Sequence, residues 1–249
     1  MTQRALYRPA LVVLESPEAV AAEVAQRILR FVETRARPVL GLATGRTPLA
    51  VYARLAAAHR AGTSFAAVES FNLDEYFGLG PAHPGAFACY MQRHFFEQVD
   101  MLAGHGHLPS GLGDPALEAR AYEATIDAAG GIGLQLLGIG RNGHIGFNEP
   151  GSEFDSRTRI VTLDESTRRA NAKDFPEGTE VPREAITMGI GTILEAQRIV
   201  LVATGEAKSE ALHAAFHRPP SRGCPASALQ LHPRVELVCD VGAAQGLRL

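Results

Sequence analysis

The sequence predicts an α/β fold: a doubly wound, mostly parallel sheet with helices on both faces and a lid-like insertion. Short apolar runs alternate along the chain with segments of helical periodicity, which is the pattern of repeated strand–helix–strand units. Parallel sheets of this kind are covered by helices on both faces. With 249 residues, of which 46% are hydrophobic, the chain can fill one large core, and we expect residues 1–249 to form a single domain.

The expected strands are short and rich in β-branched or aliphatic residues. They are LVVL at 11–14, VLGLA at 39–43, VESFNL at 68–73, LQLLGI at 134–139, RIVLVA at 198–203 and VELVC at 235–239.

The expected helices lie between these strands, at 17–34, 48–59, 84–99, 114–129 and 206–216. Ser16 can cap the first helix and Pro17 suits its first turn. The stretch 153–188 is more polar, with a short helix expected in DESTRRANAKDF and a loop in FPEGTEVP, so we expect a lid within it.

Composition excludes several function classes. The net charge is −3 and no basic run is present, so we expect no nucleic-acid partner. Cys89, Cys224 and Cys239 are widely spaced and odd in number, which predicts neither a disulfide framework nor a metal site. No apolar run reaches bilayer length and the N-terminal stretch has no leader pattern, so we expect a cytoplasmic protein without membrane contact.

The segment GIGRNG at 138–143 matches the glycine fingerprint of dinucleotide-binding proteins. That motif requires a helix directly after it, but here two further glycines and Pro150 follow within eight residues. We therefore expect no NAD site and no other cofactor.

Two strand ends have features of a phosphate site, and ligands of parallel sheets bind at such ends. TGRTP at 44–48 places free backbone N–H groups at a helix start, with Thr47 as the expected cap. Lys208 lies near the first turn of another helix, where a positive charge is mildly unfavourable because of the helix dipole. An anion bound there would compensate for this charge. An ordinary turn and a solvated lysine remain alternative interpretations.

Two other strand ends carry acid and base side chains. In NLDEY at 72–76, Asp74 and Glu75 point to opposite sides if the chain is extended, so only one faces a site. His144 and Glu149 share the glycine-rich loop, which indicates acid–base chemistry. Together the four ends suggest a sugar phosphate, although both acids of NLDEY could instead be turn residues.

The motifs TGRTP, FNLDEY, LLGIGRNGHIGFNEPG, SRTRIVTLDESTRRANA, AITMGIGTIL and ASALQLHP resemble those of glucosamine-6-phosphate deaminases along nearly the whole chain. The resemblance implies conversion of glucosamine 6-phosphate and water to fructose 6-phosphate and ammonia. It implies Asp74 as the base at C2 and His144 as the ring-opening group, oriented by Asn142 and Glu149. The implied phosphate ligands are Thr44, Gly45, Arg46, Thr47, Lys173 and Lys208.

Some positions depart from the family pattern. Arg46 replaces the second glycine of TGGTP, so it either adds a phosphate ligand or is forced into a glycine conformation. Lys173 stands where arginine is usual. Val161 replaces a lysine of an effector site and a C-terminal extension is absent, so we expect no allosteric activation.

Two alternatives stay open: a 6-phosphogluconolactonase, which shares the GxGxxGH loop but lacks the FNEP continuation, and a non-catalytic sugar-phosphate sensor. The sensor is expected to have a DNA-binding segment ahead of the domain, and only about ten residues precede the first strand. The sequence leaves open whether the protein is a monomer or a homo-oligomer.

Overall fold

A computed structural model describes residues 6–247. The first residues of the N-terminal stretch, in which no leader is expected, lie outside this range. A seven-stranded parallel sheet has the order β1-β10-β9-β6-β2-β3-β5. Its strands are β1 (Ala10–Leu14), β2 (Val39–Leu42), β3 (Glu69–Asn72), β5 (Gly106–His107), β6 (Leu134–Leu137), β9 (Ile199–Ala203) and β10 (Val235–Asp240). The predicted α/β class and parallel sheet are confirmed.

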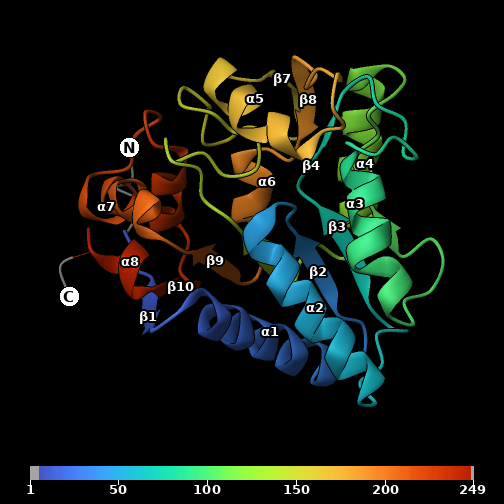
Figure 1. Cartoon of the computed structure of the whole chain (residues 1–249), viewed down its shortest axis with the longest axis horizontal. Helices are drawn as coiled ribbons and strands as arrows, with labels where there is room; N and C mark the ends of the chain where they lie inside the picture. The colour runs from blue at the N-terminus through green and yellow to red at the C-terminus, as the bar shows by residue number, and fades with distance from the viewer. Residues whose placement is uncertain (1–5, 248–249) are drawn as a thin grey trace.

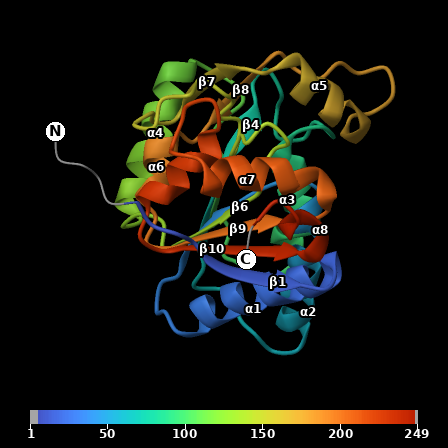
Figure 2. The ribbon, with the colours of Figure 1, turned by 90° about the vertical axis from the view of Figure 1, so that its left-hand side faces the viewer.

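Helices cover both faces of this sheet, and two hydrophobic clusters lie beneath them. Figure 2 shows α1 and α2 below the strands and α7 above them. One face packs against α1 (Pro17–Glu33), α2 (Arg46–Arg60) and α3 (Phe87–His94), which η1 (Phe96–Gln98) follows. The other packs against α4 (Pro115–Ala128), α6 (Ile190–Leu194), α7 (Ser209–His217), η4 (Pro225–Leu231) and α8 (Val241–Ala244). The short η3 (Glu206–Lys208) directly precedes α7.

The strand order places a crevice between β2 and β6. From β2 the chain continues through α2 to β3 on one side, whereas after β6 it continues to β9 on the other. Ligands of open parallel sheets bind outside the carboxyl ends of the strands where the winding direction changes in this way. The loops after β2 and β6 are TGRTP and the glycine-rich loop, so the topology brings these two motifs together.

A second sheet was not predicted. Strands β4 (Asp74–Tyr76), β8 (Glu184–Thr187) and β7 (Arg159–Thr162) form an antiparallel sheet in the order β4-β8-β7. Two of these strands come from the stretch 153–188, so that stretch is more than a short helix and a loop. Its short helix is present as α5 (Glu165–Asn171) and η2 (Ala172–Asp174), and Figure 1 shows α5 beside the small sheet.

Several predicted boundaries were wrong. The expected strand 68–73 ends at Asn72, and the chain then enters β4 in the other sheet. Helix α2 begins two residues earlier than expected, with Gly45 as its N-cap, so Thr47 lies inside the helix and does not cap it. The expected helix 84–99 is limited to α3 and η1. Within residues 6–247 no helix is long and apolar enough to cross a membrane.

Candidate active site

A cleft of about 810 Å³ opens at the carboxyl ends of β2 and β6. Its walls come from both sheets, from the start of α2 and from α5 with η2. The predicted site residues that line it are Thr44, Gly45, Arg46, Thr47, Asp74, Asn142, His144, Lys173 and Lys208. Glu149 is not part of this lining and lies behind Asn142 and His144. The topology thus brings residues from five separate stretches of sequence into one cavity.

Strand β4 separates the two acids of NLDEY, as the alternation of an extended chain predicts. The carboxylate of Glu75 turns away and accepts hydrogen bonds from the backbone N–H groups of Tyr76, Phe87 and Ala88, each at 2.8 Å. Two of these donors belong to the first turn of α3, so Glu75 stabilises that helix. Asp74 lines the cleft.

Asp74 is a buried acid, with 5% of its surface exposed. Burial, reinforced by the negative charge of Glu75, raises the pKa of Asp74 to about 8. Across from it lies Gly146, which has φ +56; a Cβ atom there would be 3.4 Å from Asp74 Oδ2. A carboxyl group with a pKa near neutrality, facing a cleft, is suited to proton transfer with carbon.

The glycine-rich loop holds His144, Asn142 and Glu149 together. Asn142 Nδ2 donates to Glu149 Oε2 at 2.7 Å, and Asn142 Oδ1 accepts from the backbone N–H of His144 at 3.2 Å. Nδ1 of His144 lies 3.4 Å from the same Glu149 oxygen. Asn142 thus orients the carboxylate and the histidine backbone, and the carboxylate is next to the imidazole ring.

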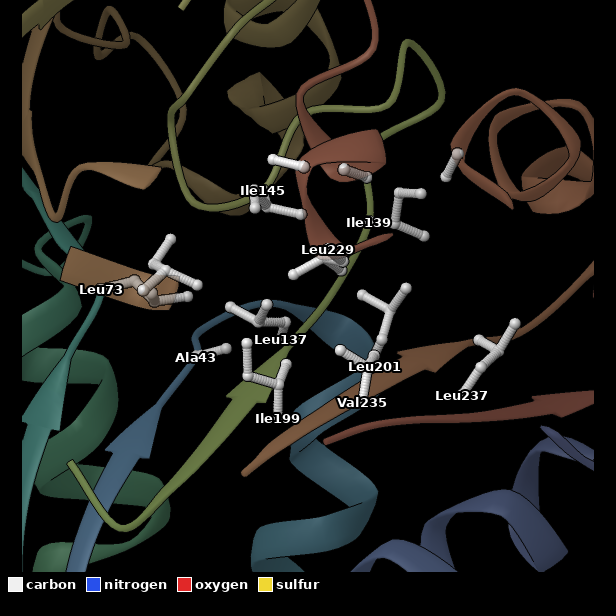
Figure 3. Packing of buried hydrophobic residues seen from close by; sticks show 14 of the residues in the cluster. Ala43, Leu73, Leu137, Ile139, Ile145, Ile199, Leu201, Leu229, Val235 and Leu237 are labelled. Carbon is white, nitrogen blue, oxygen red and sulfur yellow. The ribbon is translucent and has the colours of Figure 1, made fainter. Parts of the chain in front are cut away.

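Two anchors fix this loop over the core. The side chains of Ile139 and Ile145, at either end of the turn, point into the hydrophobic cluster around Leu137 and Leu229, as Figure 3 shows. The imidazole of His144 lies against Gly140, where a Cβ atom would come within 2.3 Å of the ring. Glycine is therefore needed at position 140 because the His144 ring packs directly against the backbone there, and not because a dinucleotide approaches it.

The other end of the cleft is positively charged. Gly45, with φ 113, caps α2 without a side-chain hydrogen bond, so the first backbone N–H groups of the helix have no capping acceptor. Lys208 Nζ donates to the carbonyl of Ile139 at 2.6 Å. Burial, together with the charge of Arg141, lowers the pKa of Lys208. A helix N-terminus beside a lysine is a suitable site for a phosphate group.

Arg46 lies within α2, and no non-glycine residue within 6–247 has a positive φ. The second alternative for this residue, a strained glycine conformation, is therefore wrong. Its guanidinium forms an ion pair of 3.3 Å with Asp174 of η2, across the mouth of the cleft. Both side chains are more than half exposed, so this pair contributes little stability and leaves Arg46 free to exchange partners.

Sequence reasoning missed Thr167, Asn171 and Tyr90, all of which line the cleft. Thr167 Oγ1 donates to Glu149 Oε1, Asn171 Nδ2 donates to the hydroxyl of Tyr76, and Tyr90 donates to the carbonyl of Gly45. Helical spacing places Thr167 and Asn171 on one face of α5, but the sequence does not indicate what that face meets.

The chain matches the model of the family described as glucosamine-6-phosphate isomerases/6-phosphogluconolactonase over residues 15–238. It is 49% identical to the glucosamine-6-phosphate deaminase of Hahella chejuensis over 96% of this chain and 92% of that protein. For the enzyme of that name from Shewanella loihica the identity is 50%, over 95% and 89%.

Among solved structures, a monomeric glucosamine-6-phosphate deaminase superposes with a TM-score of 0.93 at 41% identity, covering 95% of this chain and 99% of that one. The 6-phosphogluconolactonase of Leishmania guyanensis superposes with a TM-score of 0.78 at 18% identity, over 98% and 100% of the two chains. The latter similarity concerns the fold alone.

Proposed function

The chain belongs to the family of glucosamine-6-phosphate isomerases and 6-phosphogluconolactonases, and we propose that it is a glucosamine-6-phosphate deaminase. The observation that carries the proposal is that one cleft is lined by the buried Asp74 and by Asn142 and His144, with the Glu149 carboxylate held behind these two residues. Lactone hydrolysis needs no base at a carbon atom, whereas deamination by isomerisation does. Relatives of this name at 45–50% identity support the same reaction.

The substrate would bind with its phosphate at the positive end of the cleft. The N–H groups at the start of α2, the hydroxyls of Thr44 and Thr47, and Lys208 are the expected ligands. Lys173 and Arg46 lie at the mouth and can approach the phosphate from the solvent side. This end fixes the sugar so that its carbonyl end reaches the acid and base residues.

His144 would open the pyranose ring by moving a proton between the anomeric hydroxyl and the ring oxygen. Glu149, 3.4 Å from Nδ1, stabilises the protonated imidazole that forms in this step. Opening the ring produces the aldehyde, and this carbonyl makes the neighbouring C2 proton acidic.

Asp74 would then remove the C2 proton to give an enolamine and return a proton to C1. The resulting C2 imine adds water and releases ammonia, which leaves fructose 6-phosphate. At neutral pH the carboxyl of Asp74 is mostly protonated in the free enzyme, because its pKa is raised to about 8. A substrate ammonium group at C2 favours the ionised form, so binding itself generates the base.

The proposal is tested by incubating the purified protein with glucosamine 6-phosphate and measuring ammonia and fructose 6-phosphate. We expect equal amounts of both products. Hydrolysis of 6-phosphogluconolactone is measured beside it, and activity on the lactone alone would overturn the assignment. A protein that binds the sugar phosphate and converts neither compound would be a sensor.

A further inference from the structure

The two oxygens of the Glu149 carboxylate are held from different sides. Oε2 accepts from Asn142 at 2.7 Å and faces His144 at 3.4 Å. Oε1 accepts from the hydroxyl of Thr167 at 2.5 Å. Asn142 belongs to the same loop as Glu149, whereas Thr167 belongs to α5, a separate element that forms part of the cleft wall.

We propose that Thr167 is a positioning residue, which fixes the Glu149 carboxylate through Oγ1 and thereby couples the placement of α5 to the His144 pair. This inference rests on the proposed function, since it assigns a task to the same site. With only one oxygen held, a carboxylate can rotate about its last side-chain bond. Hydrogen bonds to both oxygens fix its plane, and with it the direction in which Oε2 meets the imidazole.

Helix α5 is suited to transmit such an effect because it contacts the cleft and the fixed part of the site at once. Ser166, Thr167 and Asn171 line the cleft, and Asn171 Nδ2 donates to the hydroxyl of Tyr76 at 2.9 Å. Thr167 itself is 6% exposed, so its hydroxyl has little access to water as an alternative partner. A substrate that contacts this face of α5 therefore acts on Glu149 through one hydrogen bond.

A purely structural interpretation is that Thr167 only supplies a hydrogen-bond donor to the half-buried carboxylate of Glu149. The two interpretations differ in the pH profile. Burial alone would raise the pKa of Glu149, but His144, Thr167 and Asn142 outweigh it and hold that pKa below its ordinary value. Removing the Thr167 hydroxyl takes away one donor to the ionised form, so Glu149 protonates at a higher pH.

The test uses Thr167→Val, which removes the hydroxyl at nearly constant volume, and Thr167→Ser, which retains it. We expect the valine variant to lower kcat about tenfold with little change in KM, the effect of losing a hydrogen bond to a charged group. The acidic limb of its kcat profile, which reports the substrate complex, should move up by about one pH unit. Serine should restore both. If the valine variant does not fold, Thr167→Ala makes the same comparison.

Tyr76→Phe is the matched control, because it removes a different hydrogen bond of α5, in which the Tyr76 hydroxyl accepts from Asn171, without touching Glu149. We expect its acidic limb to stay where the wild type has it. An equal shift in Tyr76→Phe and Thr167→Val would mean that loosening α5 is sufficient, and would overturn the proposal. An unshifted limb in the valine variant would overturn it as well.

A measurement without turnover separates this inference from the proposed function. The carboxyl titration of Glu149 is followed by NMR on protein labelled with ¹³C-glutamate and assigned with Glu149→Gln. The Thr167→Val variant should titrate about one pH unit higher than the wild type. An unchanged titration refutes the role of Thr167, whereas absence of ammonia release by the wild type refutes only the proposed function.

Discussion

Replacing Asp74 by asparagine should make the protein more stable while it abolishes activity. The folded protein keeps this buried carboxyl protonated up to about pH 8, whereas its ordinary pKa is 3.8. Between these two values the unfolded chain releases a proton that the folded chain retains. Wild-type stability therefore falls as the pH rises through this window, and is unaffected by this group below it.

The magnitude follows from the size of the pKa difference. Each pH unit inside the window costs the wild type about 1.4 kcal/mol, so the loss is about 2 kcal/mol at pH 5 and about 4 kcal/mol at pH 7. Asparagine has no charge to bury and avoids this loss. The stability advantage of Asp74→Asn should therefore grow by about 3 kcal/mol between these two pH values.

Urea unfolding of both proteins at the two pH values measures this difference. Asp240→Asn is the matched control, because Asp240 is also 5% exposed but accepts hydrogen bonds from the backbone N–H groups of Gly205 and Ala243. An amide there offers one acceptor oxygen fewer and should destabilise the protein by about 1–2 kcal/mol. If the gap between Asp74→Asn and the wild type does not change with pH, then Asp74 is already ionised in the folded protein and the reasoning fails.

Three further substitutions test other parts of the site. Lys208→Ala should raise KM at least tenfold with a smaller change in kcat, because the expected contact with the phosphate is shared by ground and transition states. Steady-state kinetics measure both constants. Equal losses of activity with unphosphorylated glucosamine would contradict a role in phosphate binding. Asn142→Asp places a second carboxylate against Glu149 and beside His144, which favours the protonated imidazole. Activity should be retained, and the acidic limb of the kcat profile, which reports the complex in which Asp74 is already ionised, should move up by at most about one pH unit; a limb shifted to lower pH would count against this arrangement. Gly140→Ala puts a Cβ atom where the His144 ring lies, so kcat should fall about 100-fold. Phosphate binding, measured by calorimetry, should be retained. An unchanged kcat would show that the position of the ring is not critical.

Six of the seven strands of the main sheet were predicted, and the central ones, β2, β6 and β9, are entirely buried; the two-residue β5 was not predicted. Strand β9 reads IVLVA and is entirely buried, and a strand that needs no polar face is recognised as a continuous apolar run. The capping pair Ser16 and Pro17 likewise marked the start of α1, where the Ser16 hydroxyl accepts from the N–H of Ala19.

The second sheet was not predictable for the opposite reason. Strand β4 has three residues and follows β3 after a single residue, so Leu73 connects what reads as one strand. Strand β7 is only partly buried and ends on an exposed Thr162. Neither has a hydrophobic pattern long enough to distinguish a strand from a loop.

The placement of a predicted site residue was predictable where a local backbone rule fixes the direction of its side chain. The alternation of Asp74 and Glu75 across an extended strand is a local rule, and the structure follows it. The hydrogen bond from Thr167 to Glu149 depends on how α5 meets a loop 18 residues earlier in the chain, and the ion pair of Arg46 with Asp174 spans 128 residues. Such contacts depend on tertiary packing, for which the sequence offers no periodic signal.

The central claim is that Asp74 removes the C2 proton of glucosamine 6-phosphate on the way to ammonia. The most direct measurement uses glucosamine 6-phosphate with deuterium at C2 and follows both the label by NMR and the ammonia released. With the wild type, label should leave C2 as fast as ammonia appears, whereas Asp74→Asn should bind the substrate and show neither change. Loss of label by Asp74→Asn at the wild-type rate would contradict the account.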